Sequence, residues 1–396
     1  MLRIILRRAR QKYTREEFDL FNQLETHLDE IRELHAGQRE RVELTAKAVK
    51  LYSMCDMEEE AIVALGAQVS LGLEKRFHGG EANYALVGVK VELNAFCFTD
   101  QLYDYIGVYL HPYAALINHS CDYNSVVVFD GEELSVKAVR PIKKGEQIFI
   151  SYIDTTYPYD TRRKELSERY FFHCRCSKCL LGTDALGDGY IETAKDNSFL
   201  EAAFCQASTS INAARDDSDA ESALEKLKSA RHVLSHAGAW PITRQPYVAL
   251  RDELITTFLS LGQLQTAFAH AAVRHIKVCP VIYPPSHPIR YVHAWTMVKL
   301  AIHLSQETNT DSSDEIPVAK FDIDFDLVAW FTLCTLINKE SESCIAPSFK
   351  EMVASIFSKA HKRFAAEGVD PSKVEGLVNT ERLKIDKLAS EVLEKE

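Results

Sequence analysis

Three short segments decide the fold of this chain: Asn118-His119-Ser120-Cys121-Asp122, Gly145-Glu146-Gln147-Ile148-Phe149-Ile150-Ser151-Tyr152, and Cys174-Arg175-Cys176-Ser177-Lys178-Cys179. They follow one another in the middle of the chain. Each combines polar or sulfur side chains with an apolar neighbourhood. A chemical site built from all three is therefore the first expectation.

Between the first two segments the sequence predicts a β-hairpin. Ser125–Phe129 and Leu134–Val139 are rich in β-branched residues and flank Asp130-Gly131, a turn signal. A third strand is expected over 147–153, and a polar turn with a charged helix over 154–170. This middle part is a compact β region.

The residues before and after it have a helical period. The apolar spacing over Thr14–Leu34, with a capping box at Thr14 and Glu17, predicts a helix. Further helices are expected over 39–56 and 58–76, whereas 85–97 fits a helix or a strand. After a Gly-rich linker at 181–196, helical periodicity continues to the end, interrupted at 306–315. It resembles a degenerate tetratricopeptide-like array, whose concave face usually contacts a partner.

Composition excludes several classes of protein. The chain has 396 residues, a net charge of −11, 46% hydrophobic and 26% charged residues, which are values of a globular protein. The acidic balance argues against direct nucleic-acid binding and favours a basic peptide as the charged partner. No apolar run approaches the ~18–20 residues that span a bilayer. We expect no membrane association.

The three cysteines of the third segment are close enough in sequence to converge on one metal ion. Zinc takes four soft ligands in a tetrahedron, so a fourth ligand must come from elsewhere. Cys121 is a candidate for it. An inert reduced cluster and a redox pair remain as alternatives. Asn118-His119-Ser120 also fits a glycosylation acceptor, and Cys121 beside His119 a thiol nucleophile, but nothing else in the sequence supports either interpretation.

The order of these segments resembles the SET-domain lysine methyltransferases, and more closely the SET–MYND family. Glu92–Phe96, Arg162–Leu166 and Ser286–Ile289 are further matching stretches. The resemblance implies an α+β fold. It has a helical insertion over 1–93, a small pseudoknot-like SET core over 94–153, a post-SET zinc region over 154–182 and a tetratricopeptide-like helical domain over 183–396.

By this resemblance the chain binds S-adenosylmethionine and zinc and methylates a lysine of a protein, a histone tail among the candidates. Tyr152 is implied as the catalytic residue, because its hydroxyl orients the amine and the methyl group. The residues implied in the rest of the site are Asn94, Asn118, His119, Tyr152 and Phe172 for the cofactor, Tyr170 and Phe172 for the lysine channel, and Cys121, Cys174, Cys176 and Cys179 for zinc. His27 would lie near the adenine, with a satisfied surface histidine as the alternative.

The family's Gly-x-Gly cofactor strand and MYND zinc finger have no match in this sequence. We therefore expect either a truncated product or a degenerate homologue. The alternative function is a catalytically inactive scaffold that binds proteins through its helical array. Localisation in nucleus and cytoplasm follows from the resemblance alone.

Overall fold

The computed structural model describes residues 14–27, 30, 93–182, 197–238, 240–306, 315–338, 345–366 and 371–395. The elements before the linker are α2 (Arg15–Gln23), β1 (Phe96–Thr99), β2 (Tyr105–Tyr109), η1 (Ala114–Leu116), β3 (Asn118–His119), β4 (Ser125–Asp130), β5 (Glu133–Ala138), β6 (Phe149–Ile150), α7 (Tyr159–Tyr170) and α8 (Ser177–Leu180). Those after it are α9 (Asn197–Arg215), α10 (Ala220–His236), α11 (Tyr247–Ser260), α12 (Leu264–Ala272), η4 (Val273–Val278), α13 (Cys279–Ile282), α14 (Pro288–Gln306), η5 (Ala319–Phe321), α15 (Phe325–Asn338), α16 (Pro347–Ala366) and α17 (Pro371–Glu394).

Helix α2 begins where the sequence predicts. The Glu17 amide donates to the Thr14 hydroxyl, and the Glu17 carboxylate accepts from the Thr14 amide, so the capping box is formed. The predicted continuation of this helix to Leu34 is wrong, because α2 ends at Gln23 and Leu24 is extended and buried. The chain leaves the helix there to dock against the segment that precedes β1.

Three two-stranded sheets make up the middle of the chain. β1 pairs with β2 and β4 with β5, both antiparallel, and the predicted turn at Asp130-Gly131 is confirmed. The predicted third strand is shorter than expected. As β6 it covers only Phe149–Ile150, and it pairs in parallel with β3 rather than joining the hairpin. This parallel pair brings the segment at Asn118 beside the segment that leads to Tyr152.

A buried asparagine fixes the junction between these strands. The Asn124 side chain donates to the Gln147 carbonyl over 2.8 Å and accepts from the Phe149 amide over 2.9 Å. Its backbone carbonyl accepts from the Val139 amide over 2.9 Å. Asn124 is fully buried, so all these bonds form away from water, where an unmade bond is most costly.

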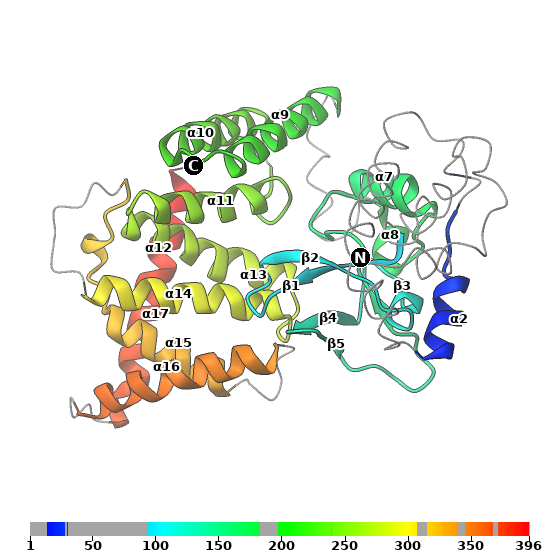
Figure 1. Cartoon of the computed structure of the whole chain (residues 1–396). Coiled ribbons are helices and arrows are strands. Elements are labelled where there is room, and N and C mark those ends of the chain that lie inside the picture. The colour runs from blue at the N-terminus through cyan, green and yellow to red at the C-terminus, as the bar shows by residue number, and fades with distance from the viewer. Residues whose placement is uncertain are drawn as a thin grey trace.

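The second half is a helical array, as the periodicity predicts. Apolar residues at helical spacing form one continuous core, which includes Ala207, Leu227, Ala267, Phe268 and Leu388. In Figure 1 the helices α9 to α12 and α14 to α17 stack side by side, and α17 crosses behind several of them. Stacked helix pairs bury apolar faces that no single pair could bury alone.

The β4–β5 hairpin packs against this array (Figure 1). Val128 is buried in one cluster with Trp295 of α14 and Phe349 of α16. The Lys137 ammonium donates to the Ile345 carbonyl over 2.7 Å, and the Ser286 hydroxyl donates to the Val139 carbonyl over 2.8 Å. The β region and the helical array therefore share a core, and a pocket can draw its walls from both.

Several of the expected elements lie outside the residues that the structure describes. The helices predicted over 39–56 and 58–76, and the linker from 183 to 196, lie outside the described residues. The domain boundaries at 93, 153 and 182 stay predictions. Among the described helices, none is both long enough and apolar enough to cross a bilayer.

Candidate functional site

One pocket of about 880 Å³ collects the residues that the sequence singled out. Its volume lies within the range of small-molecule sites, roughly 300–1,000 Å³. The predicted cofactor and channel residues that line it are Asn94, Asn118, His119, Tyr152, Tyr170 and Phe172, together with His27. These residues come from segments more than 140 positions apart in the chain. The fold thus brings together every one of these predicted side chains.

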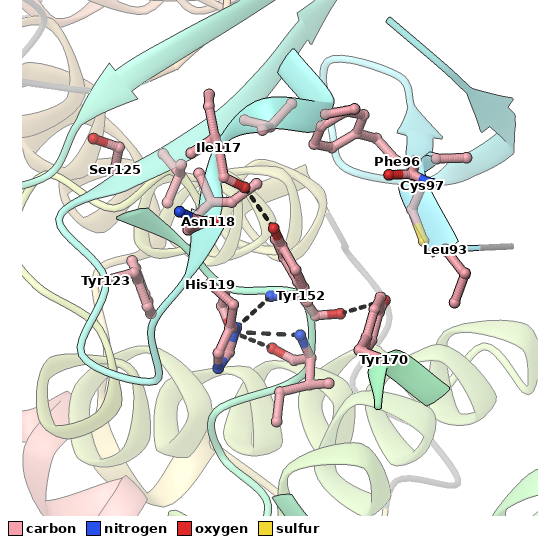
Figure 2. A pocket seen from close by; sticks show the side chains of 18 of the residues that line it. Leu93, Phe96, Cys97, Ile117, Asn118, His119, Tyr123, Ser125, Tyr152 and Tyr170 are labelled. Carbon is pink, nitrogen blue, oxygen red and sulfur yellow. Dashed lines mark hydrogen bonds between the residues drawn. The ribbon is translucent and has the colours of Figure 1, made fainter. Parts of the chain in front are cut away.

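Tyr152 is held at three points (Figure 2). Its hydroxyl donates to the Ile117 carbonyl over 2.6 Å, and its amide donates to His119 Nδ1 over 2.9 Å. Its carbonyl accepts from the Tyr170 hydroxyl over 3.2 Å. The side chain and the backbone of Tyr152 are both fixed, which is what a residue that orients reacting groups requires.

Burial, and next the neighbouring Tyr170, raise the pKa of Tyr152 to about 12. The phenol therefore keeps its proton at neutral pH. A protonated hydroxyl that donates to the Ile117 carbonyl can still accept through its free lone pairs. Tyr152 is suited to orient an amine or a polarised methyl group and unsuited to act as a base.

Aromatic rings surround Tyr152. The ring centroids of Tyr152 and Tyr170 are 5.1 Å apart, and Phe172 meets Tyr152 edge-on at 6.4 Å. Phe171, between them in the chain, has a left-handed backbone (φ 60°) and ends α7. That turn sends Tyr170 and Phe172 toward the pocket and lets Phe171 pack on His27 at 5.1 Å. Such a wall attracts cations through its ring faces.

Two asparagines face the pocket from different segments. The Asn94 side chain donates to the Glu25 carbonyl over 3.0 Å, which joins the segment after α2 to the start of β1. Asn118 lies on β3 with an exposed side chain and pairs with Phe149 through its backbone. Its amide is thus free to meet a ligand in the pocket. His119, the next residue, is turned inward and buried.

The four predicted metal ligands converge beside the pocket. The sulfur atoms of Cys121, Cys174, Cys176 and Cys179 all lie within 4.8 Å of one another, and all four are free thiols. A tetrahedral zinc ion with Zn–S bonds of about 2.3 Å needs sulfurs about 3.8 Å apart. The Cys121–Cys179 separation is 3.5 Å. The observed separations bracket this value, so the donor set fits zinc after small shifts of the sulfurs.

Mutual hydrogen bonding already differentiates these thiols. The hydrogen bond with Cys121 is the largest cause that lowers the pKa of Cys174 and that lowers the pKa of Cys176 to about 5, and the same bonding raises the pKa of Cys121. Thiolates are the form that binds metal. The cluster also packs with buried Leu166 and Ile153 into a small core of its own. It thereby anchors α7 to the segment after β6 that carries Tyr152.

The opposite wall of the pocket was not predicted. Tyr123, Tyr283 and His287 line it, and His287 stacks on Tyr283 with ring centroids 4.5 Å apart. Burial raises the pKa of Tyr123 and lowers that of His287 to about 3, so both rings are neutral. The sequence pattern could not pair residues so distant along the chain. The stretch Ser286–Ile289 was the only available signal.

One carboxylate lies in this wall. Asp154 accepts from the Thr156 amide over 2.8 Å and from the Gln245 side chain over 2.8 Å, so the helical array holds it in place. Burial and next the charge of Asp154 raise the pKa of Tyr123. A fixed negative charge among neutral rings makes this side of the pocket attractive to a basic peptide.

Comparison with known proteins identifies this arrangement. Residues 5–153 match the family model of the SET domain. Relatives include "Histone-lysine N-methyltransferase SMYD3" of Mus musculus, 29% identical over 231 residues, which cover 54% of this chain and 48% of that protein. This chain contains a SET domain, and it resembles proteins of the SET–MYND family. The predicted resemblance is confirmed.

Two other relatives match a shorter stretch. "N-lysine methyltransferase SMYD2" of Homo sapiens is 41% identical over 90 residues, 23% of this chain and 21% of that protein. "SET domain and MYND-type zinc finger protein 6" of Schizosaccharomyces pombe is 40% identical over 90 residues, 23% of this chain and 19% of that protein. The chain spans at most about half the length of these relatives.

Proposed function

We propose that this SET-domain protein is an S-adenosylmethionine-dependent protein-lysine methyltransferase with a structural zinc site. The observation that carries the proposal is the position of Tyr152. It is pinned at three points in a pocket that also holds Asn94, Asn118 and the aromatic wall. The names of the relatives, which are lysine methyltransferases, support the same reaction.

When bound, S-adenosylmethionine supplies a methyl group activated by a sulfonium. The residues of the chain position the cofactor and the substrate amine relative to each other. Asn94 and Asn118 present amides to the cofactor side of the pocket. The Tyr152 hydroxyl orients the substrate amine, and the faces of Tyr170 and Phe172 accommodate the cationic groups of both reactants. Holding amine, methyl and sulfonium in line is an effect of orientation, and such effects contribute a large share of a barrier reduction.

The cysteine cluster would hold zinc with Cys121, Cys174, Cys176 and Cys179 as ligands. It lies between α7 and the segment that carries Tyr152, and four thiolate ligands would leave no open coordination position, so its role would be structural. We propose a lysine of a basic peptide, such as a histone tail, as substrate, in keeping with Asp154 and the net charge of −11. Nuclear and cytoplasmic localisation, and protein partners of the helical array, are proposals from the resemblance.

An array of lysine-containing peptides tests the activity. The zinc-loaded chain is incubated with S-adenosylmethionine carrying a tritiated methyl group. We expect label on basic peptides, and none on copies in which lysine is replaced by arginine. Peptides that are bound but not labelled, by a protein shown to be folded and zinc-loaded, would contradict the proposal and support the scaffold alternative.

A further inference from the structure

The imidazole of His119 spans the distance between the cysteine cluster and Tyr152. The Tyr152 amide donates to His119 Nδ1 over 2.9 Å, and His119 Nε2 lies 3.3 Å from Cys121 Sγ. An amide N–H can only donate, so Nδ1 must be the unprotonated nitrogen. In the neutral ring the proton is then on Nε2 and points at the sulfur. One ring thus accepts from the Tyr152 amide, as Figure 2 shows, and donates to the sulfur of a metal ligand.

The ring has no room to leave this position. His119 is 8% exposed, and its ring lies 5.3 Å from the ring of Tyr152 and 5.8 Å from that of Phe172. Its backbone is paired with Ile150 of β6, and the Ser120 amide donates to the Ile150 carbonyl over 3.0 Å. Rigid backbone on both sides means that a shift at Cys121 reaches the ring directly.

The same two segments are tied to the cysteine loop elsewhere. The Ser177 hydroxyl donates to the Asp122 carboxylate over 2.5 Å, and the Lys178 ammonium donates to the Thr155 carbonyl over 3.1 Å. These bonds hold the loop against the segments that follow His119 and Tyr152 in the chain. The His119 ring reaches a cluster sulfur and the Tyr152 backbone through hydrogen bonds, whereas Phe172 packs against the core of the cluster and against the Tyr152 ring.

We propose that His119 is a positioning residue that couples metal binding at the cysteine cluster to the placement of the Tyr152 backbone. A metal-bound thiolate is a stronger hydrogen-bond acceptor than a free thiol, and charged acceptors roughly double the strength of such bonds. A bound metal therefore tightens the Nε2–H bond to Cys121 and orients the ring, and the oriented Nδ1 holds the Tyr152 amide. Histidine partners outside the ligand set commonly tune metal sites in this way. This inference rests on the proposed function at one point, namely that Tyr152 is the catalytic residue.

Two substitutions separate the two ends of the ring. In His119→Asn the side-chain oxygen occupies the position of Nδ1 and nothing replaces Nε2. In His119→Gln the side-chain nitrogen occupies the position of Nε2 and nothing replaces Nδ1. Each variant therefore keeps one hydrogen bond and loses the other. Ser120→Ala is the matched control, because it removes the neighbouring bond that the Asp122 amide donates to the Ser120 hydroxyl and touches neither ring nitrogen.

Two measurements on the zinc-loaded chain read the two ends, and neither needs cofactor or substrate. Zinc release to a chromogenic chelator reports the Cys121 end. Amide hydrogen exchange of Tyr152, in protein labelled with ¹⁵N-tyrosine and assigned by loss of the signal in Tyr152→Phe, reports the other end. Neither measurement depends on methyl transfer. A chain without methyltransferase activity would therefore still test the role of His119.

The coupling predicts that removal of zinc from the parent chain speeds exchange of the Tyr152 amide roughly fivefold, the effect of weakening one hydrogen bond. His119→Asn, which has no group at Nε2 to reach Cys121, should release zinc about tenfold faster, and its Tyr152 exchange should no longer respond to zinc. His119→Gln keeps the parental release rate and exchanges the Tyr152 amide roughly fivefold faster, the effect of losing one hydrogen bond. Ser120→Ala changes neither. Parental values in both histidine variants, or equal loosening of both ends in all three variants, would overturn the proposal and reduce His119 to a packing residue.

Discussion

Substitution of Tyr152 by phenylalanine isolates the contribution of one hydroxyl. The change keeps the amide bond to His119, the carbonyl bond from Tyr170 and the ring contacts, because these use the backbone and the ring. It removes only the 2.6 Å bond to the Ile117 carbonyl. One such bond contributes about 1 kcal/mol to the free energy of unfolding. The variant should therefore fold and bind zinc like the parent chain.

The effect on methyl transfer should be much larger. Without the hydroxyl, nothing at this position orients the amine, and misplacement of about 1 Å in a reacting geometry costs roughly 100-fold in rate. We expect kcat to fall by at least about 100-fold, and the dissociation constant of S-adenosylmethionine to change by less than about fivefold, the effect of one hydrogen bond. Single-turnover transfer of a radiolabelled methyl group measures the first, and calorimetry the second.

Tyr159→Phe is the matched control. It deletes the same group from a tyrosine on α7 whose hydroxyl accepts from Arg163 over 2.8 Å and which does not line the pocket. Its methylation rate should stay within about twofold of the parent, because the ring and its packing remain and only a hydroxyl outside the pocket is lost. A Tyr152→Phe protein that methylates at the parental rate would refute the assignment of Tyr152.

Three further predictions concern the cluster, the acid response and the contact between the two halves. Cys176→Ser should lose zinc and unfold at lower temperature, measured by metal analysis and calorimetry, because four-thiolate zinc contributes folding energy; an unchanged zinc content would refute the ligand set. Burial lowers the pKa of His287 to about 3 and that of His293 to about 4. Only the unfolded chain therefore protonates these two side chains as the pH falls from about 6.5 to 4, and the free energy of unfolding should fall in that window by up to roughly 1.4 kcal/mol per pH unit and group. His293→Gln should make the free energy of unfolding, measured by urea titration, depend less steeply on pH. Lys137→Met should cost about 1 kcal/mol by loss of its bond to Ile345, and equal urea midpoints in both proteins would contradict that contact.

The sequence predicted the parts of the site that are local in the chain. Three of the four clustered cysteines lie within six residues, so their spacing alone places them near one point. The hairpin around Asp130-Gly131 and the helix ending at Tyr170 were predictable because turn residues and periodicity are local signals. Cys121 was only a candidate, since no local rule says which distant thiol completes a tetrahedron.

What could not be predicted depends on pairing between distant segments. The parallel pair β3–β6 joins Asn118 to Phe149, and neither strand is long enough to show a period. The end of α2 at Gln23 was missed because the apolar spacing continues past it, whereas the buried Leu24 and the bond between Asn94 and Glu25 pull the chain out of the helix. The wall of Tyr283 and His287 is likewise formed by tertiary packing.

The most direct test of the account is calorimetric titration of S-adenosylmethionine into the purified, zinc-loaded chain of 396 residues. We predict that S-adenosylmethionine binds saturably, with one site per chain. It also predicts that Asn118→Ala, which changes an exposed side chain at the pocket, weakens that binding while the protein stays folded. If a protein shown to be folded and zinc-loaded gave no heat of binding, the proposal that this pocket binds S-adenosylmethionine would be contradicted.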